Sequence, residues 1–484
     1  MQAGPRIGTL LLLSVAGFSG LAAWGGQHLL KRQHQRLTPE VSQASLWQHY
    51  RWAIDPQTRR EAALLMVARD GAPDLLHGQG WGRDPMAAVV LERAALTADA
   101  HGKTSEATQT WQFLLDRFPK APGSAWARLA LGNNNPALHQ QLLQQQPAHP
   151  AALTLAARDG SEALPNHQGA LHLARWNARR AGALELMVDA CQATGAQAPQ
   201  ADQRQTLAQA LAKRGHADAA LTCLQELDAA PQTQLAIGRS LLMHGDPDVG
   251  TAQLLTLAQN HPNHPASLEA ARILSEPLNP EPGVLDALPA ALQERSAAVA
   301  AARVRLAGGN GADAALIRWP NDPDIWQLQW DLAREAFLAG DWEPARDLLK
   351  RHYEDGPLPS PLETRRLFWL GLSQKQLGET AKAERTWRRL IEAFPGGYYR
   401  WRAMEQLGVA EPLDLRAPAP PRESPTWQPL NSHNNLVNEL WRLDQVHAAW
   451  EAWQAQADPS VPPPPEERLA EGRLRLAVGD TWMG

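Results

Sequence analysis

A pattern built on glycine recurs five times along this 484-residue chain and constrains its fold more than any other feature. The glycines are Gly102, Gly215, Gly245, Gly340 and Gly378. Small residues stand seven positions before them (Ala95, Ala208, Gly238, Ala333, Gly371) and five after (Ala107, Ala220, Gly250, Ala345, Ala383), and large apolar residues nine after (Trp111, Leu224, Leu254, Leu349, Trp387). This spacing predicts helical hairpins: the glycine turns the chain, the small residues let two helices approach, and the large residue fills the space to the next hairpin.

A proline completes most copies of the pattern. It stands seventeen positions after the glycine in four of them, at Pro119, Pro262, Pro357 and Pro395, and one position early, at Pro231, in the copy at Gly215. Proline ends a helix because it lacks the N–H that the helix needs. The whole order resembles the tetratricopeptide repeat, whose hairpins of about 34 residues stack into a superhelix. We therefore expect an all-α, tetratricopeptide-like solenoid with loops of unequal length.

The composition agrees with an all-α fold and excludes some functions. Good helix formers dominate, and Val-Ile-rich runs of strand length are nearly absent. The 19 tryptophans, against 6 phenylalanines and 4 tyrosines, are expected mainly as wedges between helices. The net charge of −5, with acids and bases interspersed, argues against nucleic acid as a partner. The sequence lacks the glycine loops of nucleotide-binding proteins, so no cofactor is expected.

The N-terminus and the cysteines bear on the compartment. Residues 7–24 carry no charge, and Arg6 precedes them while Lys31 and Arg32 follow. We expect a cleaved signal peptide or a membrane anchor within residues 1–36, with an anchor favoured by the length of the run. Cys191 and Cys223 belong to no C-x-x-C motif. They would form one disulfide in an exported chain, although two buried thiols are the simpler interpretation.

Proline-rich interruptions suggest how the chain is divided. The clearest are residues 277–289, 319–323 and 412–429. We predict four parts after the N-terminus: a first superhelical part (40–276), a part with the clearest hairpins (277–410), a linker (411–429) and C-terminal helices (430–484). Within the last part, we expect residues 434–454 to form one helical unit and residues 466–478 to form the last helix.

Five stretches point to a family. They are GQGWGRDPMAAVVLE (78–92), WQFLLDRFP (111–119), FWLGLSQKQLGETAKAERTWRRL (368–390), FPGGYYRWRAMEQLG (394–408) and RLRLAVGDTWMG (473–484). In this order they resemble the helical N-terminal part of soluble lytic murein transglycosylases, especially the cyanobacterial type. The resemblance implies an exported protein of the periplasm that acts on peptidoglycan. In that family a lysozyme-like domain with Glu-Ser and Gly-Leu-Met-Gln motifs follows the superhelix and performs the cleavage.

The catalytic motifs of that family are not found here. Gly-Leu-Met-Gln is absent, and Glu423-Ser424 lies in the proline-rich linker, where no fold would bury the carboxylic acid that the reaction needs. We therefore predict no catalytic residue in this chain, which would be a shortened enzyme, an enzyme split by a frameshift, or a dedicated scaffold. The expected function is to bind or position peptidoglycan, or a cell-wall protein, at the periplasmic side of the membrane. The alternative is a protein-binding tetratricopeptide scaffold unrelated to the cell wall.

Other candidate sites are weaker. His261 and His264 stand three apart on a proline-containing turn without further ligands, so we expect a solvated loop and no metal. Tyr398, Tyr399 and Trp401 could line a sugar-binding face, but their spacing favours a seam between helices. The nearby arginines are expected on the wet side of the helices, although they could meet an anionic peptidoglycan stem: Arg385, Arg388, Arg389, Arg400 and Arg402.

Overall fold

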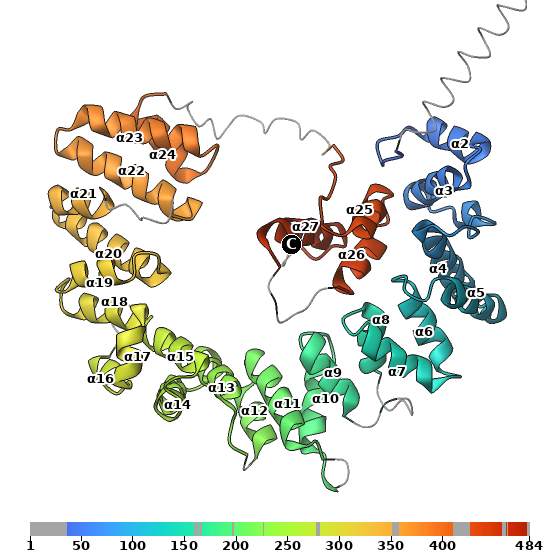
Figure 1. The fold of residues 1–484 in the computed structure, drawn as a ribbon, viewed down its shortest axis with the longest axis horizontal. Helices are drawn as coiled ribbons and strands as arrows, with labels where there is room; N and C mark the ends of the chain where they lie inside the picture. The colour runs from blue at the N-terminus through green and yellow to red at the C-terminus, as the bar shows by residue number, and fades with distance from the viewer. Residues whose placement is uncertain are drawn as a thin grey trace, which may run out of the picture. The chain divides into compact units, whose positions relative to one another are not determined.

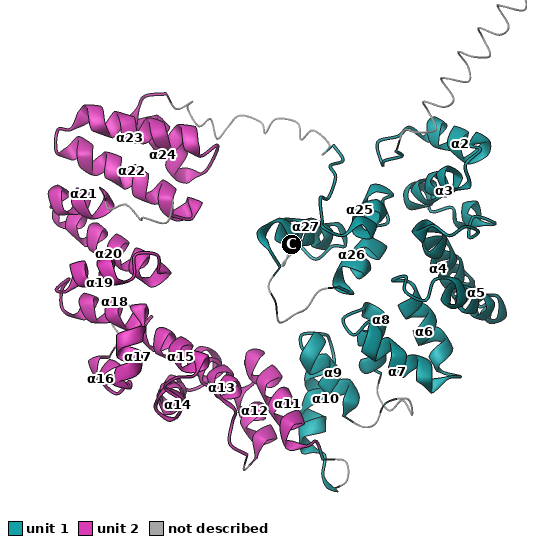
Figure 2. Ribbon diagram, viewed as in Figure 1, with its two compact units in different colours: residues 1–198, 421–484 teal, residues 199–420 magenta. Residues whose placement is uncertain are grey.

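The structure is a computed structural model that describes residues 36–158, 164, 167–195, 198–225, 227–276, 281–350, 358–409, 426–456, 461 and 463–481. Within these residues the protein is all-α and has no strand. The chain forms two compact units, one of residues 1–198 and 421–484 and the other of residues 199–420 (Figure 2). We call them unit 1 and unit 2.

Unit 1 combines the two ends of the sequence. Its N-terminal part contains α2 (Gln43–Trp52), α3 (Pro56–Asp70), η1 (Pro73–Leu76), α4 (Pro85–Ala100), α5 (Thr104–Arg117), α6 (Ser124–Gly132), α7 (Pro136–Gln145), α8 (Pro150–Ala156), α9 (Gln168–Trp176) and α10 (Ala183–Gln192). Its C-terminal part contains α25 (Asn435–Arg442), α26 (Val446–Gln454) and α27 (Pro465–Ala477).

Unit 2 is a stack in which each helix packs mainly on its neighbours in the sequence (Figure 1). It contains α11 (Ala201–Lys213), α12 (Ala217–Leu224), α13 (Pro231–His244), α14 (Pro247–Asn260), α15 (Pro265–Ser275), α16 (Pro282–Asp286), α17 (Ala290–Arg295), α18 (Ala297–Leu306), α19 (Ala312–Arg318), α20 (Pro323–Ala339), α21 (Trp342–Lys350), α22 (Ser360–Gln376), α23 (Thr380–Ala393) and α24 (Tyr398–Gln406). This arrangement of hairpins is an α-solenoid, as the glycine pattern predicts.

All five predicted hairpins are present, as α4–α5, α11–α12, α13–α14, α20–α21 and α22–α23. Four of the five turn glycines have positive φ, between 71° at Gly102 and 91° at Gly215, a conformation that suits glycine. The small residues at the helix crossings and the large residue of each copy are buried wherever they carry a side chain. At Gly371 a β-carbon would lie 2.4 Å from Nε1 of Trp387, so the crossing of α22 and α23 requires glycine there.

The C-terminal helices pack against the N-terminal helices within unit 1. Their apolar side chains share one core with those of α3, η1 and α4. Buried polar contacts lie beside this core: Arg442 pairs with Glu61 at 3.0 Å and donates to the carbonyl of Leu37 at 2.6 Å. The amide of Gln445 donates to the carbonyl of Leu64 at 3.2 Å. Residues nearly 400 positions apart therefore belong to one folded body.

This division differs from the one that the sequence suggests. The units separate at residues 198/199 and 420/421, while the proline-rich stretch 277–289 lies inside unit 2 and contains α16. Residues 434–454 form two helices rather than one, because the chain turns at Asp444, which has a φ of 58°. The last predicted helix is present as α27.

Some predictions fall on residues that the structure does not describe. These are the apolar run at 7–24, Pro357 of the repeat pattern, most of the predicted linker at 411–429, and Glu423. None of the described helices combines the length and the apolar content needed to cross a membrane.

The cysteines differ from the simpler interpretation. Cys191 and Cys223 are both disulfide-bonded, and no cysteine is free in the described part of the chain. Both are buried, so the helices enclose the oxidised sulfurs rather than two thiols.

Candidate binding cleft

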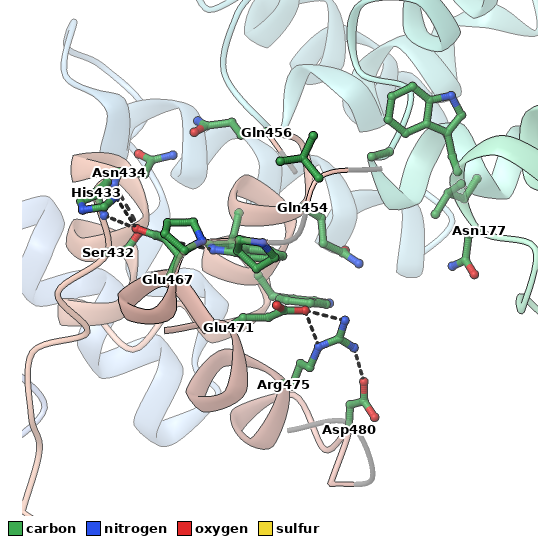
Figure 3. A pocket seen from close by; sticks show the side chains of 18 of the residues that line it. Asn177, Ser432, His433, Asn434, Gln454, Gln456, Glu467, Glu471, Arg475 and Asp480 are labelled. Carbon is green, nitrogen blue, oxygen red and sulfur yellow. Dashed lines mark hydrogen bonds and ion pairs between the residues drawn. The ribbon is translucent and has the colours of Figure 1, made fainter. Parts of the chain in front are cut away.

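Unit 1 contains a cleft of about 980 Å³ between its C-terminal helices and the segment from α8 to the end of α9. Figure 3 shows Asn177, at the end of α9, on one side, and Glu467, Glu471 and Arg475 of α27 on the other. A volume of this size is at the upper end of the range for sites that enclose a drug-sized ligand.

The apolar part of the cleft is made of indoles. Trp450 and Trp453 stand three positions apart on α26, which places both rings on one face of the helix. The rings stack with 5.4 Å between centroids and 9° between planes. The guanidinium of Arg475 lies 4.9 Å from the centre of the Trp450 ring. Trp176 lines the same cleft from the end of α9.

Glu467 is a fixed anion in the wall of the cleft. It accepts hydrogen bonds from the backbone N–H of His433 at 2.5 Å, the Ser432 hydroxyl at 3.2 Å and Nε1 of Trp453 at 3.2 Å. Burial alone would raise its pKa, but these donors outweigh burial and hold the pKa of Glu467 below its ordinary value. The group is therefore ionised at neutral pH.

The other charged groups of α27 form a short ion-pair chain. Arg475 lies 2.7 Å from Glu471, one turn back on α27, and 2.7 Å from Asp480, just after the helix. Figure 3 shows the guanidinium between the two carboxylates. This arrangement fixes Arg475 beside the stacked indoles.

Two amides in the cleft have unused hydrogen-bonding groups. Oε1 of Gln454 and Nδ2 of Asn434 are buried and have no hydrogen-bond partner within the described residues. The Asn434 oxygen is occupied, because it caps α25 by accepting the N–H of Leu436 at 2.9 Å. Both residues line the cleft, and a buried polar group without a partner is costly, so a ligand that reached these atoms would recover that cost.

Three titratable side chains lie buried between α4, α6, α8 and α26. Nε1 of Trp126 donates to Glu451 at 3.0 Å. Burial, and then the neighbouring Glu451, raise the pKa of Glu92 to about 8, and burial raises that of Glu451. His149 has its Nε2 only 3.7 Å from Glu451, yet burial lowers the pKa of His149 to about 3, so this contact joins a neutral ring to a carboxyl group rather than two ions.

The aromatic and arginine side chains that the sequence suggested as a sugar-binding face lie on α23 and α24, outside the cleft. Tyr399 packs against Phe368 in the predicted seam, whereas Tyr398 is 65% exposed, so the seam prediction was wrong for Tyr398. Arg385, Arg388 and Arg389 are exposed on α23, as expected.

The prediction of a solvated loop is wrong for His264. Nδ1 of His264 accepts the N–H of Ala266 at 3.1 Å, so this histidine caps α15 and is not a solvated loop residue. No group of three metal-ligating side chains occurs in the described part of the chain.

Part of unit 2 matches a known protein family. The family model described as Tetratricopeptide repeat matches residues 367–397, which include the end of α22, all of α23 and the turn before α24. This hairpin is similar to a tetratricopeptide repeat. No curated protein matches the chain. The coarse prediction of a helical-repeat scaffold is therefore confirmed, while the resemblance to lytic transglycosylases stays a prediction.

Proposed function

We propose that this helical scaffold binds peptidoglycan in the cleft of unit 1, at the periplasmic side of a membrane, without cleaving it. The observation that carries the proposal is the stacked pair Trp450–Trp453 next to the unpartnered amides of Gln454 and Asn434. A sugar ring has an apolar face that stacks on indoles and hydroxyl groups that pair with amides and carboxylates. The cleft offers both kinds of contact.

The cleft's carboxylates favour binding over catalysis. Cleavage of a glycosidic bond needs a carboxylic acid whose pKa is raised so that it can donate a proton. The pKa of Glu467 is lowered instead, and its hydrogen-bond capacity is used by protein donors. Glu471 is paired with Arg475. Both carboxylates are therefore engaged by protein donors, and neither is placed as a free acid for cleavage.

Two features support a location outside the cytosol. Disulfides persist mainly in oxidising compartments, and both cysteines of this chain are disulfide-bonded. The uncharged run at residues 7–24 has the length of a signal peptide core or a short membrane anchor. Both features are expected of a protein that meets peptidoglycan.

A second candidate function is the binding of a polypeptide partner by unit 2. It is favoured by the match of residues 367–397 to the tetratricopeptide repeat, and solenoids of this kind present extended surfaces to their partners. The exposed Tyr398 and the exposed arginines of α23 lie on this hairpin and on the helix after it. This candidate places the site in unit 2 and leaves the cleft of unit 1 unused.

A sedimentation assay with purified peptidoglycan tests the first proposal. We expect the chain to co-sediment with peptidoglycan and the Trp450→Ala variant to bind roughly tenfold more weakly, because one stacking contact is worth up to about 1.5 kcal/mol. Gln454→Leu should also weaken binding. Trp52→Ala is the matched control, since Trp52 is 76% exposed on α2 and does not line the cleft. Failure of the unmodified chain to co-sediment would refute the proposal, and equal loss in the Trp52 variant would count against the cleft.

A further inference from the structure

A smaller cavity of about 370 Å³ lies elsewhere in unit 1, between α4, the turn after α5, and α25 and α26. Its walls are mainly apolar: Ala88, Val89, Phe118, Leu436, Leu440 and Ala448. The volume corresponds to about a dozen water-sized groups, which is room for a short hydrocarbon chain with a polar end. None of the residues that line this cavity also lines the proposed peptidoglycan cleft.

One carboxyl group faces this apolar space without a partner. Glu92 is only 7% exposed, lines the cavity, and has no hydrogen bond or ion pair within the described residues. Its Oε2 lies 2.4 Å from the position that a β-carbon at residue 123 would occupy, so the absence of a side chain at Gly123 makes room for the carboxyl group. Burying a polar group without a hydrogen bond is costly, and a ligand that supplied the bond would recover that cost.

The same cavity is lined by exposed cations. Arg83 and Lys120 have no ion pair in the described part of the chain. The third cation, Arg117, is already engaged, since it donates to the carbonyl of Gly80 at 2.9 Å and its guanidinium lies 4.8 Å from the ring of Phe113. Arg83 and Lys120 therefore supply positive charge that no described residue pairs with, and this charge favours an anionic ligand.

We propose that this cavity binds a small amphipathic carboxylate, with its hydrocarbon chain between α4 and α25 and its carboxylate held by Arg83, Lys120 and the Glu92 carboxyl group. The apolar walls, the unpartnered acid and the two free cations are each explained by such a ligand. The charged groups that act on Glu92 are Glu451 on α26 and Arg93 on its own helix, while Arg83, Arg117 and Lys120 line the same cavity. Because the pKa of Glu92 is raised to about 8, its O–H is available to the ligand at neutral pH.

Calorimetric titration of the full chain with three eight-carbon probes tests the proposal. Octanoate, octanol and octylamine share a hydrocarbon chain and differ in charge. We expect octanoate to bind at least tenfold more tightly than octylamine at pH 7, with octanol between them. The affinity for octanoate should fall as the pH rises through about 8, since the ionised Glu92 repels the carboxylate.

Charge reversal at exposed side chains tests the proposal without disturbing the fold. Lys120→Glu changes an exposed side chain, so we expect it to leave the circular dichroism spectrum unchanged, lower octanoate affinity at least tenfold and favour octylamine. Lys103→Glu is the matched control, because Lys103 has a 64% exposed side chain and does not line the cavity. Equal binding of the three probes, or no binding of octanoate below its micelle concentration, overturns the proposal. Neither result bears on peptidoglycan binding by the cleft.

Discussion

Replacing Trp387 by alanine is expected to destabilise unit 2 by about 3 to 5 kcal/mol. Trp387 is 2% exposed between α22 and α23, and its indole N–H donates to the carbonyl of Phe368 at 3.1 Å. The substitution removes a large buried side chain and leaves that carbonyl without this bond. Urea unfolding of the purified variant, followed by circular dichroism, measures the loss.

A substitution one helix away serves as the control. Tyr398 is 65% exposed on α24, so Tyr398→Ala should change the free energy of unfolding by less than about 0.5 kcal/mol. A loss of several kcal/mol in the Tyr398 variant, or of less than about 1 kcal/mol in the Trp387 variant, would contradict the packing described for this hairpin.

Gly371 allows the contact itself to be tested. Gly371→Ala should cost about 1 to 3 kcal/mol, because the added carbon would lie 2.4 Å from the Trp387 indole. The same substitution should cost much less when Trp387 is already alanine, since the clash is then gone. Additive costs in this double-mutant cycle would show that the glycine acts through the backbone alone.

The hairpins could be predicted from the sequence because their chemistry is local. The turn glycine, the small residues at the crossing and the large residue of each copy lie within about half a repeat of one another, so spacing alone places them. The need for glycine at position 371 is not local in this sense, because Ala95 stands at the same spacing before Trp111, and only the packed geometry places the Trp387 indole against residue 371.

The candidate sites could not be predicted in the same way. The contact between Arg442 and Glu61 joins residues 381 positions apart. A periodic sequence pattern does not indicate which distant helices pack together. The cleft and the cavity both depend on that packing, so Trp450 and Trp453 were expected only as wedges. Glu92, likewise, lies in an apolar helix without any local sign that it will be buried.

Two helix starts carry a local signal in the sequence. His149 and His264 each precede a proline that begins a helix, and in both the ring Nδ1 accepts a backbone N–H at 3.1 Å. Proline at the first helical position and an acceptor just before it are a recognisable helix start. The pairs of His and Pro therefore indicate helix caps, whereas His264 was expected in a solvated loop.

The buried acids and His149 lead to the second large effect: unit 1 is expected to be most stable between about pH 4.5 and 6.5. The pKa of Glu92 is raised from 4.5 to about 8, first by burial and then by Glu451, so the folded protein holds a proton that the unfolded chain has lost. Stability therefore falls as the pH rises toward 8. Glu451, whose pKa burial also raises, adds to this loss.

His149 changes the stability of unit 1 with pH in the opposite direction. Burial lowers the pKa of His149 from 6.5 to about 3, so between these pH values the unfolded chain binds a proton that the folded protein does not bind. Stability from this group is complete above pH 6.5 and is lost as the pH falls toward 3. Between pH 4.5 and 6.5 the slopes of Glu92 and His149 oppose each other. Above pH 6.5 the Glu92 group should lower the free energy of unfolding by about 1.4 kcal/mol per pH unit, and below pH 4.5 the His149 group should lower it by about the same amount per unit.

Hydrogen exchange measured by mass spectrometry across this pH range separates the two groups. Peptides from α4 and α26 report on the buried cluster, after correction for the intrinsic pH dependence of exchange. Glu92→Gln should flatten the alkaline side alone. His149→Asn keeps a capping side chain at the start of α8 and should flatten the acidic side alone. Glu106→Gln, on an exposed carboxylate of α5, should change neither side. If Glu92→Gln left the alkaline loss intact, Glu92 would not be the group that holds the proton, and the cavity proposal would lose its hydrogen-bond donor as well.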